Sequence, residues 1–238
     1  EYTSLPPFMV EGIRFRLPVT ANGELDIAAQ DVLAQKMIYL EQLKQTVQEK
    51  RDDMAEVVIT LDNTDYNMAY FPITDLFTTE KGKAKYTKKY GNLHSGEYPV
   101  YSASSSKPLT HMDTFDYDGK YLTWSTNGFA GTILVIAGKF SINGDRGILV
   151  PKGGRTDLDF EYIKYVVQPV FRELAKGRKG DNGEDEFTKL YPSMLNDVMI
   201  PVPVDREGNV DLQAQQDIAK RYFSAEQCKR DVIEKLDA

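Results

Sequence analysis

Two stretches, one near each end of the chain, carry regularly spaced apolar residues on an otherwise polar background. In the first stretch these residues are Leu33, Met37, Leu40, Val47 and Met54. In the second they are Ile218, Tyr222, Ala225, Val232 and Leu236. Apolar residues that recur every seven positions are typical of coiled-coil helices. We therefore predict two long helices of about 27 residues, each roughly 40 Å long at ~1.5 Å per residue.

The two stretches belong to an internal repeat. Residues 1–52 align without a gap to residues 186–237, at an offset of 185, with 19 identities in 52 positions. The identities extend through the loop before each helix, where Pro18 matches Pro203 and Gly23 matches Gly208. Two unrelated amphipathic helices would not share such a loop. The sequence therefore indicates a duplication with one insert between the copies.

Each copy has the same predicted order of elements. A short turn leads into an extended apolar stretch, a polar turn follows, and the long helix then begins at Asp26 or Asp211. An aspartate at this position can accept hydrogen bonds from the free N–H groups of the first helical turn. Both apolar stripes need a cover. Two copies of one helix that bracket a globular insert pair most simply as an antiparallel coiled coil.

The insert has a different pattern. Between Tyr70 and Pro203, short alternating apolar runs are separated by Gly, Asn and Asp, which is typical of β-strands. Residues 159–174 predict one helix, and Pro169 should kink or end it. Residues 176–186, a polar run rich in Gly, should form a flexible loop. We therefore expect an α+β fold, with a β-rich domain at residues 55–203.

The composition and the motifs exclude several kinds of functional site. Of 238 residues, 41% are hydrophobic, the net charge is −7, and the chain has one Cys and two His, so a Cys/His zinc site is effectively excluded. No apolar run approaches the ~20 residues of a membrane span. We find no P-loop and no nucleophile with an adjacent base. We therefore expect neither catalytic residues nor a metal site in this chain.

The charge is unevenly distributed. Residues 1–53 hold six Lys/Arg against nine Asp/Glu, and residues 186–238 hold seven against ten, so the insert is nearly neutral. Basic residues cluster twice within it, at Lys81, Lys83, Lys85, Lys88, Lys89 and Lys107, and at Lys176, Arg178 and Lys179. Such clusters can neutralise DNA phosphates, although solvated loops have the same composition.

Short polar residues follow the first cluster and are suited to hydrogen bonding with base edges. The candidates are Ser104, Ser105, Ser106, Ser125, Thr126, Asn127 and Arg146. We interpret the aromatic residues Tyr98, Tyr101, Trp124 and Phe129 as core or loop-packing residues, because that role is commoner than base stacking.

Several segments together resemble the specificity subunit of type I restriction–modification systems. The entry to the second helix carries Ile200-Pro201-Val202-Pro203 and then Asp211-Leu212-Gln213, with first-copy counterparts. The insert resembles a target recognition domain of this family. That part of the resemblance is carried by residues 98–104, Gly128-Phe129-Ala130-Gly131-Thr132 and Lys189-Leu190. The resemblance covers essentially the whole chain, and the order of the motifs carries more weight than any single motif.

The resemblance implies a function. Family members have two recognition domains, each of which reads half of a bipartite double-stranded DNA target, with conserved helices as spacers. Partner methyltransferase subunits flip and methylate an adenine with S-adenosylmethionine, and a translocase/endonuclease subunit uses ATP. The implied location is the cytoplasm of a prokaryote, with no cofactor bound by this chain itself.

These expectations divide the chain into four regions. Residues 1–16 are the tail of a preceding recognition domain, and residues 17–54 form the first spacer region. Residues 55–203 are the recognition domain, and residues 204–238 are the second spacer region. Because the chain begins at Glu1 and holds one recognition domain, we expect the C-terminal half of a specificity subunit. The alternatives are the specificity region of a fused methyltransferase–endonuclease, and a coiled-coil adaptor that does not bind DNA.

Overall fold

The computed structural model describes residues 16–60, 63, 65–104, 107–179 and 185–237. The predicted tail at residues 1–16 therefore lies outside the described residues, apart from Arg16. The chain forms two compact units. The first holds the residues up to Val58 together with those from Gln227 onward, and the second runs from Ile59 to Glu226.

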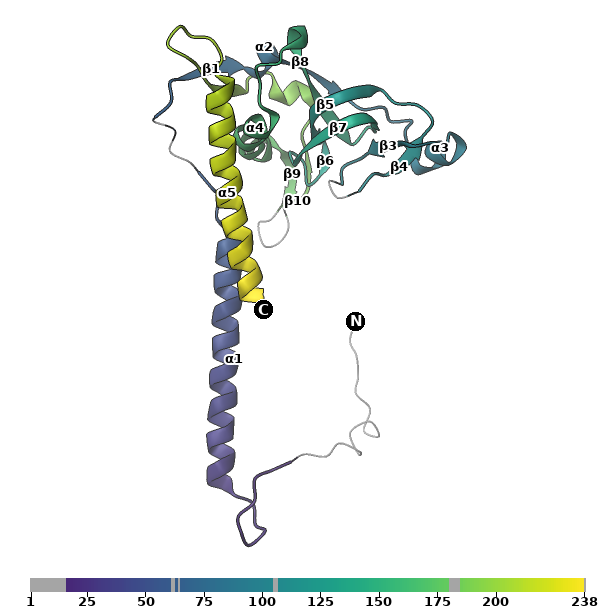
Figure 1. Ribbon diagram of the computed structural model, residues 1–238. Helices are drawn as coiled ribbons and strands as arrows, with labels where there is room; N and C mark the ends of the chain where they lie inside the picture. Colours follow the sequence, from purple (N-terminus) through teal and green to yellow (C-terminus); the bar gives the residue numbers. More distant parts are fainter. Residues whose placement is uncertain (1–15, 61–62, 64, 105–106, 180–184, 238) are drawn as a thin grey trace. The chain divides into compact units, whose positions relative to one another are not determined.

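The first unit is helical. Its main element is α1, Ile27–Glu56, and the Asp26 carboxylate accepts a hydrogen bond from the Ala29 N–H at 2.9 Å, as its predicted capping role requires. The other element is the end of α5, Leu212–Asp237. Both helices are present at close to the predicted lengths (Figure 1).

Contacts inside the first unit join the ends of the two helices. Arg51 donates to the Asp237 carboxylate at 2.7 Å, and the Lys229 ammonium donates to the carbonyls of Ala55 and Val57 at 2.7 and 2.8 Å. Of the predicted stripe residues in this unit, Val47, Met54, Val232 and Leu236 are half-buried, and Ala225, which belongs to the second unit, is half-buried as well. The stripe residues Leu33, Met37 and Leu40 are 48%, 70% and 60% exposed. A coiled coil along the whole stripe stays a prediction.

The start of α5 differs from the prediction. Ile218 and Tyr222 were expected to face the first helix, but they pack against the core of the second unit, where Ile218 is fully buried. The Tyr222 ring stacks on that of Tyr165, with centroids 4.9 Å apart. Gln215 fixes this arrangement because its side chain bonds the Asp157 carbonyl and the Asp159 N–H, each at 3.0 Å. A coiled-coil spacing therefore also serves a helix that buries one face on its own domain.

The second unit is built around a six-stranded sheet with strand order β2-β8-β5-β7-β3-β4. Its strands are β2 (Phe77–Lys81), β3 (Tyr98–Tyr101), β4 (Thr110–Met112), β5 (Tyr117–Ser125), β7 (Ile133–Ile142) and β8 (Arg146–Pro151). All neighbours are antiparallel except β3 and β7, which are parallel. The mixed helix and sheet architecture predicted for the insert is confirmed.

Smaller elements flank this sheet. Strand β1 (Met68–Pro72) pairs with β11 (Met199–Pro203), and β6 (Asn127–Gly128), β10 (Asp185–Lys189) and β9 (Lys176–Lys179) form a second small sheet. The short helices are α2 (Ile73–Leu76), α3 (Lys88–Leu93), η2 (Lys152–Gly154) and η3 (Pro192–Leu195). Residues 176–179, predicted as part of a flexible loop, are thus a paired strand. Their polar composition is compatible with the exposed face of a small sheet.

Helix α4, Phe160–Leu174, begins one residue after the predicted start, and the Asp159 carboxylate accepts from the Tyr162 N–H at 2.8 Å. It continues past Pro169 to Leu174, so Pro169 does not end the helix, and the predicted alternative of a kink stays a prediction. Its apolar face packs on the sheet through Tyr162, Ile163, Val167 and Phe171. Burial of this face outweighs the hydrogen bond that a proline removes from a helix interior.

The β5–β7 hairpin bends back over the sheet. Tyr117, at the start of β5, pairs near the end of β7, whereas Ser125, at the other end of β5, pairs with the start of β8. Three residues join β7 to β8, so the end of β7 must curl toward the start of β8. Gly119 and Gly138 lie opposite each other in this hairpin, and both have the positive φ that glycine tolerates. The curl encloses a second apolar cluster, made of Ile136, Phe140, Ile142 and Ile148.

Candidate nucleic-acid interface

The β7–β8 turn, residues 143–145 together with Arg146, gathers three segments that are distant in sequence. Residues 82–83 bond to it through the Gly82 N–H, which donates to the Arg146 carbonyl at 2.9 Å, and through a bridge between Lys83 and Asn143. Residues 102–104 bond to the Arg146 side chain. Residues 126–127 bond to Asp145. Most of the predicted DNA-binding residues lie on or beside these three segments.

The position of Arg146 corrects the prediction that it contacts bases. Its side chain is fully buried, because β8 begins there, opposite Ser125 in the centre of the sheet. The guanidinium donates to the carbonyls of Ser102 at 2.6 Å, Ala103 at 3.3 Å and Ser104 at 3.2 Å. It also donates to the Thr123 hydroxyl at 2.9 Å, and burial lowers its pKa to about 10. Arg146 thus holds the loop at residues 102–104 in place.

Ser125 and Thr126 are likewise buried, so their predicted contact with bases is wrong for this structure. The Ser125 hydroxyl donates to the Phe129 carbonyl at 2.7 Å and accepts from the Thr132 N–H at 3.1 Å. The Thr126 hydroxyl donates to the Gly144 carbonyl at 3.4 Å. These short hydroxyls serve the loop backbone, a common use of Ser and Thr at turns.

Asn127 is half-buried, and its amide donates to the Asp145 carboxylate at 2.6 Å. Asp145 also accepts from Asn143 at 3.5 Å, and its own N–H donates to the Asn143 side-chain oxygen at 2.9 Å. The carboxylate fixes the orientation of Asn127 without covering it completely. Unlike Ser125, Thr126 and Arg146, Asn127 therefore keeps a partly accessible side chain.

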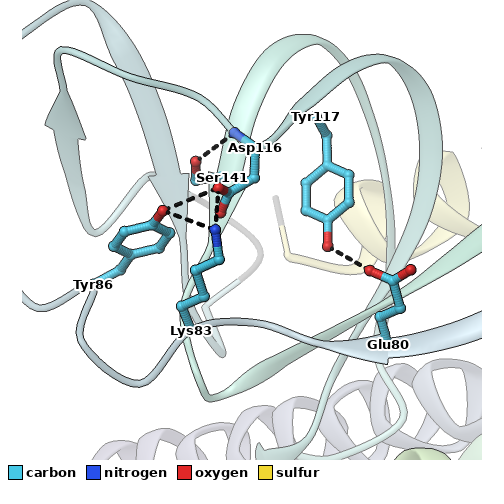
Figure 2. Close-up of polar contacts among 6 residues, drawn as sticks. All are labelled: Glu80, Lys83, Tyr86, Asp116, Tyr117 and Ser141. Atoms are coloured by element: carbon cyan, nitrogen blue, oxygen red, sulfur yellow. Dashed lines mark hydrogen bonds and ion pairs between the residues drawn. The ribbon is translucent and has the colours of Figure 1, made fainter.

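The basic segment, residues 81–89, is anchored by the contacts shown in Figure 2. The Lys83 ammonium bonds to the Asp116 carboxylate and to the Tyr86 hydroxyl, which itself donates to Asp116 at 3.0 Å. The bond to Asp116 raises the pKa of Lys83. The Asp116 N–H donates to the Ser141 hydroxyl at 3.0 Å, so the network reaches strand β7. Lys83 therefore holds the segment in place and is partly neutralised.

The remaining lysines of this segment are available to a ligand. Lys85, Lys88 and Lys89 are exposed, and none has a carboxylate partner among the residues that the structure describes. Lys85 lies over the rings of Tyr86 and Tyr90, 5.5 Å from each centroid. Lys81 lies over the Tyr191 ring at 4.9 Å. The segment therefore presents positive charge from a fixed backbone, which favours contact with an anion.

The other predicted residues are spread more widely. Ser104 and Lys107 are exposed at the two ends of a gap, and Ser105 and Ser106 lie outside the described residues. Lys176 is exposed on β9, opposite Lys189 of β10. Arg178 and Lys179 belong to the same strand, but their side chains lie outside the described residues.

Phe129, interpreted from the sequence as a core or loop-packing residue, is not packed in a core. Its ring is 61% exposed, and the Arg172 guanidinium lies over one face, 3.3 Å from the centroid. Trp124, by contrast, is fully buried, as predicted. Gly at positions 128 and 131 indicated a tight turn, and a tight turn can present its central side chain outward.

No group of three or more His, Cys, Asp or Glu residues is placed to hold a metal ion among the residues that the structure describes. Within the same ranges, no helix has the length and apolarity needed to cross a membrane.

Comparison with known sequences gives a consistent result. The family model of the type I restriction modification DNA specificity domain matches residues 66–235. S.MpnORF615P of Mycoplasma pneumoniae, named as a type I specificity subunit, is 29% identical over 171 residues, or 71% of this chain and 62% of that protein. The type I restriction enzyme MpnII specificity subunit of the same organism is 29% identical over 171 residues, or 71% and 47%. The chain thus spans about half to three fifths of the length of these relatives.

Solved structures share the fold. The type I S subunit from M. genitalium has a TM-score of 0.52 at 19% identity, over 71% of this chain and 41% of that chain. The HsdS subunit from Thermoanaerobacter tengcongensis has a TM-score of 0.53 at 15% identity, over 88% and 51%. Since the family model covers well over half of the residues, the chain belongs to the type I restriction–modification DNA specificity family.

Proposed function

We propose that this chain is a DNA-recognition module that reads one half of a bipartite target and catalyses no reaction. One observation carries the proposal: three loops bearing exposed lysines and polar groups converge on the β7–β8 turn. Cations position a protein on DNA by neutralising phosphates, and fixed polar side chains discriminate between bases. The loops combine both kinds of group on one rigid support.

The chemistry of restriction and methylation would belong to other subunits. We place the binding of S-adenosylmethionine and ATP on methyltransferase and translocase/endonuclease partners, which would dock on the exposed polar faces of the long helices. The complex would act in the prokaryotic cytoplasm. The named relatives support this assignment, since they are type I specificity subunits. The purified chain should transfer no methyl group from S-adenosylmethionine, and mixing it with a methyltransferase subunit should give a complex in analytical ultracentrifugation.

The DNA-binding proposal predicts a specific dependence on salt. We expect duplexes of random sequence to bind with an affinity that falls steeply between 50 and 200 mM salt, the range over which phosphate contacts are lost by counterion competition. Replacement of Lys85, Lys88 and Lys89 together by Ala should weaken binding to all sequences alike. The slope of log K against log salt should fall by about 0.9 for each lysine that contacts a phosphate. Fluorescence anisotropy at four salt concentrations measures both quantities.

A matched triple variant controls for net charge. Lys36, Lys44 and Lys50 are also exposed, but they lie on α1. Their replacement by Ala should leave the salt slope unchanged. In contrast, Asn127→Ala should change the preferred sequence in a selection from random duplexes while leaving the slope intact. A wild-type chain with no salt-dependent affinity for DNA would instead favour the protein-binding adaptor.

A further inference from the structure

The outer face of the β6-β10-β9 sheet has an unusual composition. Thr188 of β10 is buried, so its neighbours Phe187 and Lys189 lie on the opposite, outer face. Phe187 is 49% exposed, and Lys189 is exposed as well. In the strand register Lys189 lies opposite Lys176 on one side and Asn127 on the other. Aromatic, cationic and amide groups therefore share one exposed surface.

Two features of this surface work against stability. Side chains directly opposite each other in antiparallel strands have Cβ atoms about 4.5–5.5 Å apart, and like charges at such a pair are destabilising. Lys176 and Lys189 form such a pair. Phe187 on this face, and Phe129, which directly follows β6, leave roughly half or more of their surfaces in water. An anionic ligand with flat apolar parts would relieve both costs at once.

The loop that presents Phe129 is held by four hydrogen bonds. The Phe129 carbonyl accepts from the Ser125 and Thr132 hydroxyls at 2.7 and 3.0 Å. The neighbouring Ala130 N–H donates to the Thr188 hydroxyl at 3.1 Å, and the Ala130 carbonyl accepts from Arg172 at 2.9 Å. Because this backbone is already held in place, the loop loses little conformational entropy when a ligand binds to the ring.

We propose that the outer face of the β6-β10-β9 sheet is a second DNA contact that binds unstacked bases. Phe129 and Phe187 lie against bases that have left the helical stack, and Lys176 and Lys189 bind the flanking phosphates. Stacking on aromatic rings tolerates any base, and lysines bind phosphate without regard to sequence. DNA fits this surface better than a protein partner, because its phosphates match the paired lysines and its bases match the two rings. The inference rests on the proposed DNA-binding function and assigns it a further site.

Two probes separate stacking from ordinary duplex binding. One, the perfect duplex, is a 30-base-pair duplex of random sequence. The other, the bubble duplex, is the same duplex with three unpaired bases at its centre. The variant replaces Phe129 and Phe187 together by Ala in the full chain. The control replaces Tyr70 and Phe223 by Ala, since these rings are 67% and 58% exposed but lie on β1 and α5. Anisotropy gives all affinities, and thermal unfolding checks that both variants fold.

We expect the wild type to bind the bubble duplex more tightly than the perfect duplex. The double Phe variant should lose affinity for the bubble duplex by on the order of tenfold for each ring that stacks. Its affinity for the perfect duplex should fall much less, and its salt slope should not change. Replacement of Lys176 and Lys189 by Ala should lower the slope on both probes by up to about 0.9 per lysine.

Several outcomes would overturn the inference. One is unchanged affinity of the double Phe variant for the bubble duplex, and another is an equal loss on both probes. A variant that keeps its DNA affinity but loses binding to a purified methyltransferase subunit would identify a protein interface instead. These results leave the proposed function standing if the wild type binds DNA. A wild type that binds neither probe removes the proposed function as well.

Discussion

At the scale of single residues, buried polar groups beside the β7–β8 turn hold the neighbouring loops in place. Arg146 is the main example, because its charge is held under residues 102–104 by carbonyl and hydroxyl oxygens. The sequence predicted that Arg146 contacts base edges, which would require an exposed side chain. Its burial depends on the pairing of Arg146 with Ser125, twenty-one residues away in the chain, which local patterns do not reveal.

Arg146→Met should lower the free energy of unfolding by roughly 3 kcal/mol, because it removes the donor to several oxygens of a buried network. Urea unfolding at pH 7 measures this change. Hydrogen exchange should also become faster around residues 102–104, since their carbonyls lose the group that orders them. DNA affinity should fall mainly for the preferred sequence, while the salt slope should stay as in the wild type.

A second arginine provides the control. Arg155 bonds the Asp157 carboxylate at 2.7 Å through one terminal nitrogen, but both side chains are partly exposed. Arg155→Met should therefore cost less than about 1 kcal/mol, the usual value of an exposed ion pair. Equal costs for the two variants would show that Arg146 has no special supporting role.

At the scale of elements, repeated sequence does not mean repeated environment. Leu33 of α1 and Ile218 of α5 occupy the same position in the two copies, at the offset of 185. Ile218 is fully buried in the core of the second unit, whereas Leu33 is 48% exposed. The seven-residue spacing identified both helices, yet it could not say which neighbour each stripe contacts.

This difference gives a paired prediction. Ile218→Ala should lower the free energy of unfolding of the chain by about 2–5 kcal/mol, the range for removing a large apolar side chain from a core. Leu33→Ala should change it by less than about 0.5 kcal/mol, because alanine is a better helix former and little buried surface is lost. Urea unfolding of the two variants tests the comparison. A large cost for Leu33→Ala would show that α1 buries its stripe in solution.

Local signals predicted some elements well and others poorly. Asp159 marks the start of α4 because a carboxylate cap is a local interaction, readable from neighbouring residues. Residues 176–179 looked like loop because Gly and charged residues disfavour strands, but their pairing with β10 supplies the missing hydrogen bonds. Phe129 was assigned to packing since exposure depends on the loop that carries it. Pairing between segments distant in the sequence determines most of the features that local patterns did not predict.

At the scale of the whole molecule, the chain combines one match to the specificity-domain family model with two long helices, which we propose act as spacers. A helix of 30 residues such as α1 extends about 45 Å at ~1.5 Å per residue, a distance of more than one DNA turn. In the proposed assembly, the length of α1 would set the separation between this domain and a second one. Specificity would then include the spacing between the half-sites as well as their sequences.

Deletion of residues 34–40 tests this role. The deletion keeps the phase of the stripe and shortens α1 by about 10 Å, or roughly three base pairs at ~3.4 Å each. We expect selection from a library of spacer lengths, carried out with the complete two-domain assembly, to recover a spacer about three base pairs shorter. Both half-site sequences should be unchanged. Recovery of the original spacer would contradict the spacer role of α1.

The way in which the β7–β8 turn holds its loops has a consequence for how such proteins change. The Arg146 guanidinium donates to the backbone carbonyls of residues 102–104, and the Thr126 N–H donates to the Asp145 carbonyl of the turn. Because Arg146 binds residues 102–104 through their carbonyls, substitution of the side chains at these three positions leaves this support intact. In the proposed DNA-binding role, a lineage of these proteins would acquire new DNA targets by exchanging side chains at residues 102–104, while the fold beneath them is inherited unaltered.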